Sequence, residues 1–595
     1  MLRLRDGAEK PVSSTEYRYD SEYRLVSATT PDARVEFEYD ADGHVIAESI
    51  NGRRVEQDYD ALNGRPVAWR LDGVAMSFTH GPAGRLTQWQ VDGHAPLHLG
   101  HDALGRETAR RSEAGFVSGQ RHGATGNLVE QWAGRLTAES GAVPQDVYRQ
   151  MEYDRAYNMT RIRDGRWGDT AYRYDVNDQI TQAKGGVRTL PREEAFSYDV
   201  NLNIRQYGQT PNRHFEVMAF TKQAQQSGRV IKRDEDDYRY DDCGRLVEKT
   251  VLTDGFRPQR WRYRWDAQGQ LSELITPQGE CWTYRYDAFG RRISKRRQGT
   301  TKGIAGYDYQ WRGDQLVAET PVQADGTAVV ESSVYWLYEP GALTPGARYE
   351  KGQLHYVVRD HMGTPRELLT ESGEVVWAQK LSVWGRSERY RFGGWNAPND
   401  ESGPGCPWRY AGQWEDEESG LYYNRFRYYD SEAVQYLTPD PIGLRGGINS
   451  YAYAPNPLGY IDPLGLCKAE LPSGSNTIKR PDGSDLITIP DNARIRKLTP
   501  PDGYVGDYGY EYKWTNASGG TTTVRIHGID PAAPPGSNAS QGWVVRIMDG
   551  KKSMDVNGTY YPQGIFNESS PNYNPSAIND VHIPIDKPTS FPGVN

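Results

Sequence analysis

The first two thirds of the chain alternate hydrophobic and polar residues in short segments, and each segment ends in a turn sequence. The segments "YRYDSEYRLVS", "FEYDADGHVIAES" and "QDYDALNGRPVAW" place Tyr-Asp pairs at 19/20, 39/40 and 59/60. Later copies include "MEYDRAYNMTRI", "YRYDDCGRLVEKT" and "YRYDAFGRRISKR". Alternation with a period of two is typical of a half-buried strand, and Asp-Xaa-Xaa-Gly supplies an Asx-type turn. Each unit therefore predicts a strand, a turn and a second strand.

A single hairpin of this kind is marginally stable, but stacked hairpins give each other neighbours on both sides. The repeats therefore predict one continuous, curved and wound β-sheet. The composition agrees, because 595 residues with 40 Tyr, 16 Trp and 63 Gly favour short aromatic strands joined by glycine turns. We expect a mainly β protein with more than one structural unit.

Charge and cysteine usage exclude several classes of protein. The net charge of −9 argues against a large nucleic-acid-coating surface but allows one small basic site. The cysteines lack a CxxC pair, so we expect free thiols rather than a disulfide framework or a zinc knuckle; they are Cys243, Cys281, Cys406 and Cys467. The polar start "MLRLRDGAEKPVSS" predicts neither a signal peptide nor a membrane anchor, and no window has the length of a membrane-spanning helix.

Two Asp-Pro-Xaa-Gly-Leu units, beginning at Asp440 and Asp462, lie where the repeats stop. Taken alone, each unit makes a tight turn with Pro at the second position and Gly at the fourth. The same two aspartates also suit peptide hydrolysis without a metal, in which two carboxylates share one proton. Glycines at 443, 446 and 447 let backbone segments approach closely. Both interpretations remain open from the residues alone.

The Tyr-Asp repeats resemble the YD repeats of Rhs proteins and of the C components of insecticidal toxin complexes. In those families the sheet winds into a hollow shell around a cargo. The resemblance runs from Tyr17 to Leu466. The repeat region is short for the family, which leaves open a partial shell or further parts upstream.

The stretch from "GQWEDEESGLYYNRFRYYD" through "YLTPDPIGLRGG" to "YIDPLGL" resembles the end of the Rhs core, where the family cuts its own backbone after the last Leu. The resemblance implies a scissile bond between Leu466 and Cys467. It also implies Asp440 and Asp462 as the catalytic pair of an aspartyl autoprotease. Arg427 matches the family's supporting arginine, which keeps one carboxylate ionised, and Asp430 is the reserve carboxylate. The chain departs from the family at Val434 and Gln435, where Gly and Arg are usual. We therefore expect a shell over 1–405, a core end over 406–466 and a toxin domain over 467–595.

Residues 467–595 differ from the rest, with 12 Lys and Arg against 13 Asp and Glu and no repeats. The segments "YGYEYKWTN", "TTTVRIHGID" and "GWVVRIMDG" predict at least three strands bounded by turn residues. No amphipathic helix of ten residues or more is evident. A small β-rich or α+β fold is expected.

Two histidines and several cations in this segment suit metal-independent RNA cleavage. His527 and His582 supply a base for the 2′-hydroxyl and an acid for the leaving oxygen, and guanidinium groups stabilise the charged phosphate. Arg525 and His527 have the same parity on one predicted strand and so project from one face. Arg546 on a neighbouring strand joins them in this interpretation. The alternative is that these polar side chains merely occupy the solvent side of a strand. No clustered ligand set for a metal and no cofactor motif is evident.

The stretches "VRIHGIDPAAPPGSNASQGWVVRI" and "SSPNYNPSAINDVHIPI" are similar to the type-thirty polymorphic toxins, a family predicted to be nucleolytic. Asn538, Asn574 and His582 lie within the matching motifs. We therefore take Asn538, Asn574 and Lys513 as candidate substrate-binding residues. Turn formation is the alternative role for the two asparagines.

The leading hypothesis is an Rhs toxin that is made in the bacterial cytoplasm, cuts its own tail free and is secreted by a specialised system, with type VI secretion expected from the family. Its tail would be a ribonuclease acting on RNA in the target cell. Expected partners are a cognate immunity protein, secretion-apparatus components and a chaperone. One alternative is an NAD-consuming ADP-ribosyltransferase in the tail. Another is a repeat protein without enzyme activity whose tail is an adhesive module.

Overall fold

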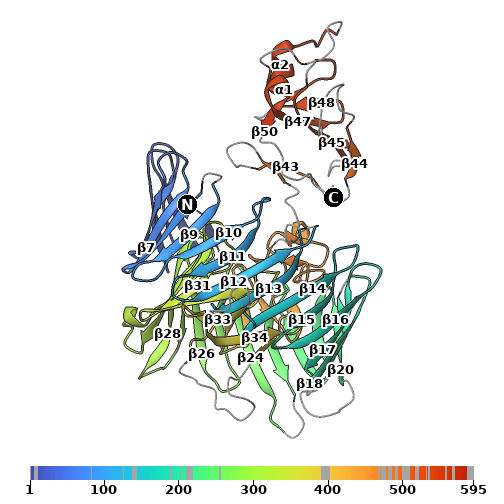
Figure 1. Ribbon diagram of the computed structural model, residues 1–595. Helices are drawn as coiled ribbons and strands as arrows, with labels where there is room; N and C mark the ends of the chain where they lie inside the picture. The colour runs from blue at the N-terminus through green and yellow to red at the C-terminus, as the bar shows by residue number, and fades with distance from the viewer. Residues whose placement is uncertain are drawn as a thin grey trace. The chain divides into compact units, whose positions relative to one another are not determined.

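The chain forms two compact units, of which the larger comprises Met1–Gly123 and Leu128–Leu471 and the smaller contains Pro472–Asn595. The computed structural model (Figure 1) describes residues 2–5, 11–81, 84–124, 126–136, 144–187, 190–201, 203–209, 219–252, 256–389, 403–466, 469–470, 477–479, 485–489, 493–498, 509–515, 521–530, 533, 537–555, 559–565 and 570–585. Each unit has its own hydrophobic core. The division lies a few residues beyond Leu466.

The larger unit is built on one sheet of 35 strands. Its first strands are β1 (Leu2–Arg5), β2 (Pro11–Tyr19), β3 (Leu25–Thr29), β4 (Arg34–Tyr39), β5 (Val45–Ile50), β6 (Arg53–Tyr59), β7 (Pro66–Leu71), β8 (Val74–His80), β9 (Leu86–Val91), β10 (Leu97–His101), β11 (Glu107–Ser112) and β12 (Phe116–His122). The middle strands are β13 (Leu128–Arg135), β14 (Val147–Tyr153), β15 (Met159–Asp164), β16 (Gly168–Tyr174), β17 (Ile180–Val187), β18 (Leu190–Tyr198), β19 (Ile204–Gln209), β20 (Ala219–Gln226), β21 (Arg229–Arg233), β22 (Asp236–Tyr240), β23 (Leu246–Val251) and β24 (Gln259–Trp265). The last are β25 (Leu271–Ile275), β26 (Cys281–Tyr286), β27 (Arg292–Arg297), β28 (Ile304–Arg312), β29 (Gln315–Gln323), β30 (Val334–Leu337), β31 (Ala347–Glu350), β32 (Gln353–Arg359), β33 (Pro365–Thr370), β34 (Val375–Leu381) and β35 (Ser387–Arg389).

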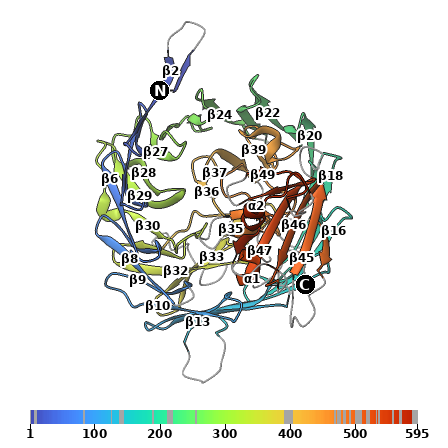
Figure 2. The same cartoon turned by 90° about the horizontal axis from the view of Figure 1, so that it is seen from above.

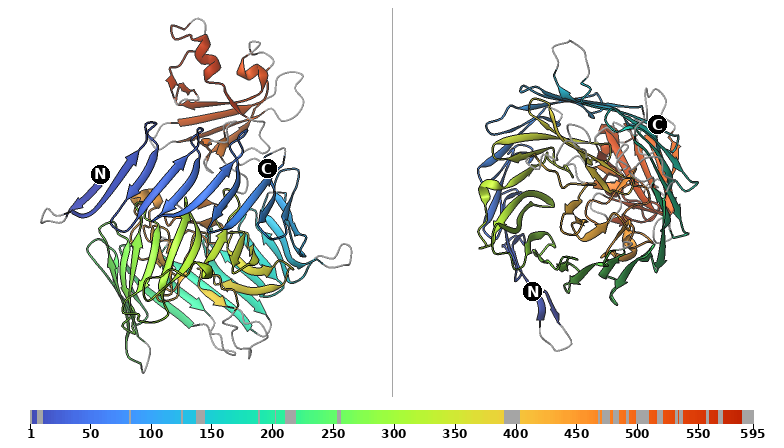
Figure 3. Two further views of the ribbon diagram at one scale, coloured as in Figure 1. Left: turned by 90° about the vertical axis from the view of Figure 1, so that its left-hand side faces the viewer. Right: turned by 90° about the horizontal axis from the view of Figure 1, so that it is seen from below.

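Each strand of this sheet pairs antiparallel with the next in sequence, as in β4 with β5 and β5 with β6. The sheet curves back on itself, so that early strands meet late ones (Figures 2 and 3). Gln310 on β28 donates to the carbonyl of Arg53 on β6 (3.1 Å), and the backbone N–H of Phe116 donates to the carbonyl of Glu371 (2.8 Å). The expected mainly β, wound-sheet architecture is confirmed.

In the repeat hairpins, the aspartate of the Tyr-Asp pair closes the turn that follows it. Asp241 Oδ1 accepts hydrogen bonds from the backbone N–H groups of Cys243 (3.0 Å) and Arg245 (2.9 Å), and Asp20 makes the same pair of contacts. Asp241 Oδ2 binds Arg245 Nε at 2.8 Å. The carboxylate therefore satisfies turn N–H groups that no neighbouring strand reaches.

In several of the pairs the tyrosine ties its hairpin to an earlier one. Tyr39, Tyr198 and Tyr286 each donate through the hydroxyl to the carbonyl of Leu25, Ile180 and Leu271, at 2.7, 2.7 and 2.9 Å. The pairing register shifts at the tyrosine in each of these strands, and this irregularity lets the tyrosine side chain contact the carbonyl of the earlier strand. The Tyr-Asp pair thus joins one repeat internally and links it to its predecessor.

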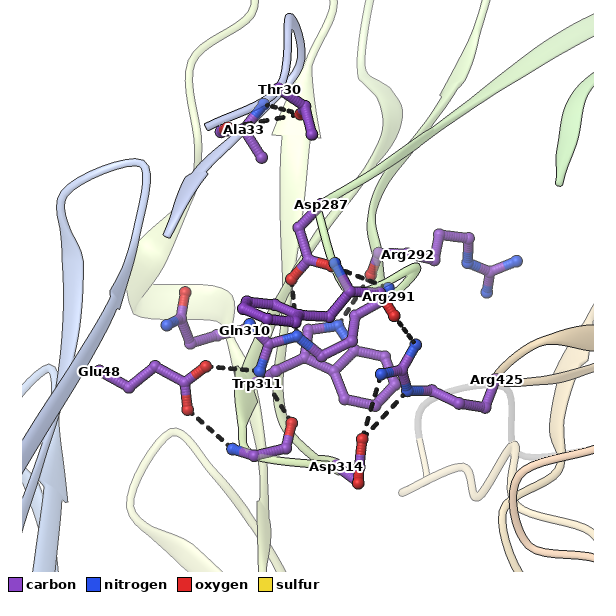
Figure 4. A network of polar contacts seen from close by, with 12 residues as sticks. Thr30, Ala33, Glu48, Asp287, Arg291, Arg292, Gln310, Trp311, Asp314 and Arg425 are labelled. Atoms are coloured by element: carbon purple, nitrogen blue, oxygen red, sulfur yellow. Dashed lines mark hydrogen bonds and ion pairs between the residues drawn. The ribbon is translucent and has the colours of Figure 1, made fainter. Parts of the chain in front are cut away.

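Buried charges also join distant parts of the sheet. Arg291 binds Asp287 beside it and Glu48 on β5 (Figure 4), and all three side chains are nearly inaccessible to solvent. Arg149 on β14 similarly bridges Asp164 and Glu367. Removing one partner of such a pair would leave an uncompensated buried charge, which is strongly destabilising.

The core end, residues 406–466, adds a four-stranded sheet of β36 (Trp414–Asp416), β37 (Leu421–Asn424), β38 (Arg427–Asp430) and β39 (Gln435–Tyr436). It continues through the 3-10 turn η2 (Gly443–Gly446) to β40 (Tyr460–Ile461), which pairs with β41 (Ala469–Glu470). In the long sheet, a 3-10 turn, η1 (Val330–Ser332), precedes β30. Strands β36, β37 and β39 lie inside the curve of the long sheet (Figure 2). Asp416 makes a bidentate contact with Arg292 of β27, and neither side chain is exposed. The long sheet thus neutralises the buried charge of the segment that it surrounds.

The smaller unit is β-rich, as expected, and its described residues form one seven-stranded sheet and one pair of short strands. Its strands are β42 (Thr477–Lys479), β43 (Asp485–Thr488), β44 (Arg494–Lys497), β45 (Gly509–Thr515), β46 (Thr521–His527), β47 (Trp543–Asp549), β48 (Lys552–Met554), β49 (Tyr560–Tyr561) and β50 (Ile583–Ile585). The helices α1 (Asn538–Gln541) and α2 (Pro575–Asp580) are short. The three strands expected from sequence correspond to β45, β46 and β47. Tyr512, Val524 and Ile547 are among the residues that form the core on one face of this sheet.

We expect Asp241→Ala to weaken the hairpin of β22 and β23, because two turn N–H groups and Arg245 lose their acceptor. A loss of about 2 kcal/mol in local stability would follow. Limited proteolysis of the full chain should show faster cutting at this turn. The matched control is Asp242→Ala, which alters the exposed neighbouring residue. Equal protease sensitivity of the two variants would contradict the role given to Asp241.

Candidate functional site

The hairpin of β37 and β38 carries the arginine of the proposed cleavage site. Asn424 pairs with Arg427 across its turn, and Arg425 in the turn has a φ of 55°. Arg425 donates to the carbonyl of Phe289 (2.9 Å) and binds Asp314 (3.1 Å) in the long sheet (Figure 4). These contacts fix the hairpin that presents Arg427.

Arg427 brings the two Asp-Pro units together. Its Nη2 lies 3.0 Å from Asp440 Oδ2 and 3.3 Å from Asp462 Oδ2. The same guanidinium donates to the carbonyls of Gly465 (2.5 Å) and Ser450 (2.9 Å). The Arg427 and Asp462 side chains are at most 1% exposed and that of Asp440 is 2% exposed, so the group is shielded from water.

Asp462 accepts hydrogen bonds on both oxygens. Leu466 donates its backbone N–H to Oδ1 at 2.8 Å, and Tyr436 donates its hydroxyl to Oδ2 at 2.9 Å. Burial raises the pKa of the Asp462 carboxyl, while Arg427 and the two donors oppose that rise. Two carboxyls around one arginine are suited to share a single proton.

Asp440 lies beside the carbonyl of Leu466, the residue before the expected scissile bond. A Cβ placed at Gly446 would be 2.0 Å from Asp440 Oδ2 and 2.6 Å from the Leu466 carbonyl oxygen. These two oxygens therefore flank the same point, which only a glycine leaves open. Cys467, on the other side of the bond, lies outside the described residues.

Asp430, the reserve carboxylate, has a different setting. It forms an ion pair with Lys249 on β23 at 2.7 Å and accepts from the backbone N–H groups of Glu432 and Ala433. Burial acts to raise the pKa of Asp430, but Lys249 and these N–H groups bring it below its usual value. Its contacts indicate a permanently charged anchor between the core end and the long sheet.

The two departures from the family pattern have visible roles. Val434 adopts a φ of 56°, in the left-handed region that favours glycine, which explains why Gly is usual there. Gln435 accepts from the backbone N–H of Val230 (2.9 Å) and donates to the Tyr240 hydroxyl (2.7 Å). The turn before Asp440 is thus formed despite the departures.

Sequence reasoning missed Asn424 and Tyr436, which are both fully buried beside Asp462. Asn424 Nδ2 donates to the Tyr436 hydroxyl (2.7 Å) and to the main-chain carbonyl of Asp462 (2.9 Å). The available signal was the position of Asn424 in "YYNRFRYYD", three residues before Arg427 and so opposite it in a tight hairpin.

The second candidate site lies on the sheet of the smaller unit. Arg525 on β46 is the register partner of Arg546 on β47, and His527 follows two residues later. Val524 and Ile526, the two neighbours of Arg525, belong to the core, so the arginine and the histidine share the other face, as expected. Arg525 also binds Glu511 on β45.

The structure brings the two histidines together. Their ring centroids are 6.1 Å apart with the planes nearly perpendicular. Each ring donates from Nδ1 to a backbone carbonyl, His527 to Gly528 (2.8 Å) and His582 to Ile578 (2.6 Å). Burial lowers the pKa of both imidazoles, that of His582 to about 4, and the charge of Arg546 adds to the effect. Both rings are therefore neutral at pH 7 with Nε2 as the basic atom. Asp530, which sequence reasoning missed, acts electrostatically on both rings and follows His527 in "HGID".

The three candidate substrate-binding residues occupy different positions. Asn538 begins α1 and donates to the carbonyls of His582 (3.1 Å) and Asn579 (3.2 Å). Asn574 caps α2 by accepting from the backbone N–H of Ala577 at 3.1 Å. Lys513 is exposed on β45, two residues from Glu511. The asparagines thus hold the backbone around His582, and Lys513 lies on the same side of β45 as Glu511.

Only one group of side chains among the described residues has the spacing of a metal site, namely Asp40, Asp42 and His44. They lie in an exposed turn of the long sheet, where Asp40 already binds His44 at 3.0 Å. Neither candidate site supplies such a group in the part of the chain that is described.

In comparisons with known proteins, two family models match different parts of the chain. A family model described as "Teneurin YD-shell" matches residues 148–445, half of the chain, and one described as "Bacterial toxin 30" matches residues 484–586. "Probable deoxyribonuclease RhsA" of Dickeya dadantii is 35% identical over 67% of this chain and 26% of its own length. "tRNA3(Ser)-specific nuclease WapA" of Bacillus spizizenii is 30% identical over 35% of this chain and 8% of its own. A crystal structure of TcdB2-TccC3-TEV has a TM-score of 0.55 and 16% identity, covering 78% of this chain and 27% of that one.

The fold and the comparisons define a β-shell protein with a separate C-terminal effector domain. The chain belongs to the teneurin YD-shell family and is an Rhs-type YD-repeat protein with a C-terminal polymorphic toxin domain. It spans about a quarter of the length of the RhsA relative. Within the described ranges, no helix has the length and apolar character needed to cross a membrane.

We expect Gly446→Ala to leave the chain uncut, because the new methyl group would separate Asp440 from the Leu466 carbonyl. Electrophoresis of the purified protein would show one full-length band. Gly459→Ala is the matched control, since a Cβ there meets only Asn456 Nδ2 at 4.0 Å. Normal cleavage of Gly446→Ala would contradict the proposed approach of the two oxygens.

Proposed function

We propose that the core end is an aspartyl autoprotease that cuts the chain between Leu466 and Cys467. The observation that carries the proposal is the meeting of Asp440 and Asp462 on Arg427 beside the Leu466 carbonyl. Two plain turns would not require two buried carboxylates to converge at the cost of desolvation.

In the proposed reaction Asp462 is the base and Asp440 the acid. Burial raises the pKa of Asp462, and three donors that point at its carboxylate oppose this rise and so help it to act as the base. Asp440 Oδ2 lies beside the carbonyl oxygen, a placement that is favourable when a proton lies between the two oxygens. Arg427 contacts both carboxyls and limits the repulsion between them.

Water adds to the Leu466 carbonyl carbon while Asp462 takes its proton and Asp440 protonates the carbonyl oxygen. The carbon–nitrogen bond to Cys467 then breaks, the nitrogen takes a proton from Asp462, and Asp440 recovers the proton of the hydroxyl it formed. Atoms and charges balance without a metal or cofactor.

We expect Asp440→Asn to yield a single uncut chain, because an amide cannot deliver the proton. Asp430→Asn is the comparison variant: it should lower stability by leaving Lys249 without its partner, but the protein that does fold should still be cut if Asp430 acts only as an anchor. Cleavage of Asp440→Asn at the normal rate would remove Asp440 from the mechanism.

For the C-terminal domain we propose a nuclease, and specifically a metal-independent ribonuclease. Support comes from the neutral histidine pair next to Arg525 and Arg546. The positive charge of the arginines suits a phosphate and disfavours a metal cation. The nuclease names of the RhsA and WapA relatives agree with this class but differ in the nucleic acid named.

The lowered pKa values of the histidines constrain the mechanism. A neutral imidazole can take the 2′-hydroxyl proton directly, but the leaving oxygen needs a protonated one. Binding of an anionic phosphate next to the pair would raise the pKa of the nearer imidazole and so create that acid. The substrate would thus complete its own site.

Free toxin would endanger the producing cell, so the proposal includes an immunity protein that covers the cationic face of β46 and β47. Delivery by a specialised secretion apparatus, with type VI secretion and a chaperone as the expected components, belongs to the same proposal.

We expect residues 467–595, expressed from a repressed promoter, to stop growth and fragment total RNA, and His582→Ala to do neither. Lys551→Ala, a change beyond β47, is the matched control and should remain toxic. DNA breakdown instead of RNA breakdown would keep the nuclease and change its substrate. Growth arrest with intact RNA, intact DNA and consumption of NAD would favour the ADP-ribosyltransferase. A folded domain that does not affect growth would favour an adhesive module.

A further inference from the structure

The core end contains a buried hydrogen-bond chain that ends on Asp462. Asn424 Nδ2 donates to the Tyr436 hydroxyl at 2.7 Å, and that hydroxyl donates to Asp462 Oδ2 at 2.9 Å. None of the three side chains is exposed. Asn424 lies on β37 and Tyr436 on β39, two strands of one four-stranded sheet, so the sheet fixes the separation of these two residues.

The donor and acceptor of each hydrogen bond in this hydrogen-bond chain follow from the chemistry of the groups. The Asp462 main-chain carbonyl can only accept, so the Asn424 atom 2.9 Å from it is the donating Nδ2. Nδ2 therefore also donates to the Tyr436 oxygen, which leaves the single hydroxyl proton of Tyr436 for Asp462. The Arg427 guanidinium lies over the Tyr436 ring, 3.7 Å from its centroid, and helps to fix its position.

We propose that Asn424 and Tyr436 are positioning residues of the autoprotease, which orient Asp462 and keep it able to act as the base. The inference rests on the proposed self-cleavage and extends it to residues that do not touch the scissile carbonyl. Asn424 acts twice, because it directs the Tyr436 proton and also holds the backbone of Asp462.

A charged carboxylate in a buried site needs donors to offset the loss of water. The titratable and charged groups facing Asp462 are Arg427, Tyr436, Asp440 and Tyr453. Burial raises the pKa of Asp462, and Tyr436 is one of the groups that oppose this. Loss of the Tyr436 hydroxyl would raise that pKa further, so Asp462 would be protonated at a higher pH.

The test is the rate of cleavage of the full chain during cell-free synthesis, followed by pulse labelling from pH 6 to 8.5. We expect Tyr436→Phe to slow cleavage about tenfold, the effect of one hydrogen bond to a charged group. The loss of rate at the acidic end should begin at a higher pH than in the parent protein. Asn424→Ala should be cleaved more slowly still. Adding Tyr436→Phe to Asn424→Ala should lower the cleavage rate by a smaller factor than Tyr436→Phe does in the parent protein, because the two residues act in one hydrogen-bond chain.

Tyr429→Phe is the matched control. Tyr429 is fully buried, is the register partner of Tyr436 and donates to the carbonyl of Trp384 at 3.0 Å, without a contact to either aspartate. It should leave the pH profile unchanged. An unaltered rate and profile in Tyr436→Phe, or the same shift in Tyr429→Phe, would overturn the inference.

Asp440→Asn separates failure of the inference from failure of the proposed function. If Asp440→Asn is uncut while Tyr436→Phe cleaves like the parent, only the positioning role is lost. If Asp440→Asn is cut at the normal rate, Asp440 is not the acid and the proposed mechanism of self-cleavage is wrong. Should Asn424→Ala aggregate, the pH profile of the conservative Tyr436→Phe variant decides alone.

Discussion

The larger unit depends on the Tyr-Asp pairs that begin many of its hairpin turns. The aspartate satisfies the turn's own N–H groups, and the tyrosine hydroxyl binds a carbonyl of an earlier hairpin, as Asp241 and Tyr39 do. One dipeptide therefore solves the two problems of a long meander, which are closing each turn and fixing each repeat to the last. A sheet of 35 strands can then curve far enough for early and late strands to meet.

This curved sheet provides the buried surroundings in which the core end can carry charge. Arg292 neutralises Asp416, Lys249 neutralises Asp430, and Asp314 binds Arg425 next to the hairpin of Arg427. Each pair joins the core end to the long sheet, and a buried charge left alone in either of the first two pairs would be costly. The proposed protease is therefore assembled from residues that the long sheet holds in place, and its activity should depend on a folded shell.

The sequence was sufficient to predict the features that repeat or lie close together along the chain. The period of the Tyr-Asp pairs gave the wound sheet, and the parity of Arg525 and His527 gave their common face. It could not reveal pairs such as Arg292 with Asp416, because residues 124 positions apart leave no pattern. It also could not show that Asn538 holds the backbone of His582, since an asparagine at a helix start reads equally well as a turn former or a ligand. Such roles depend on how distant strands register.

The central claim is that this chain cuts itself between Leu466 and Cys467 once the core end is folded. Intact mass measurement of the purified wild-type protein, with N-terminal sequencing of the smaller species, tests it most directly. The account predicts two chains, the smaller beginning at Cys467 and ending at Asn595. A single full-length chain, or a new terminus elsewhere, would contradict it.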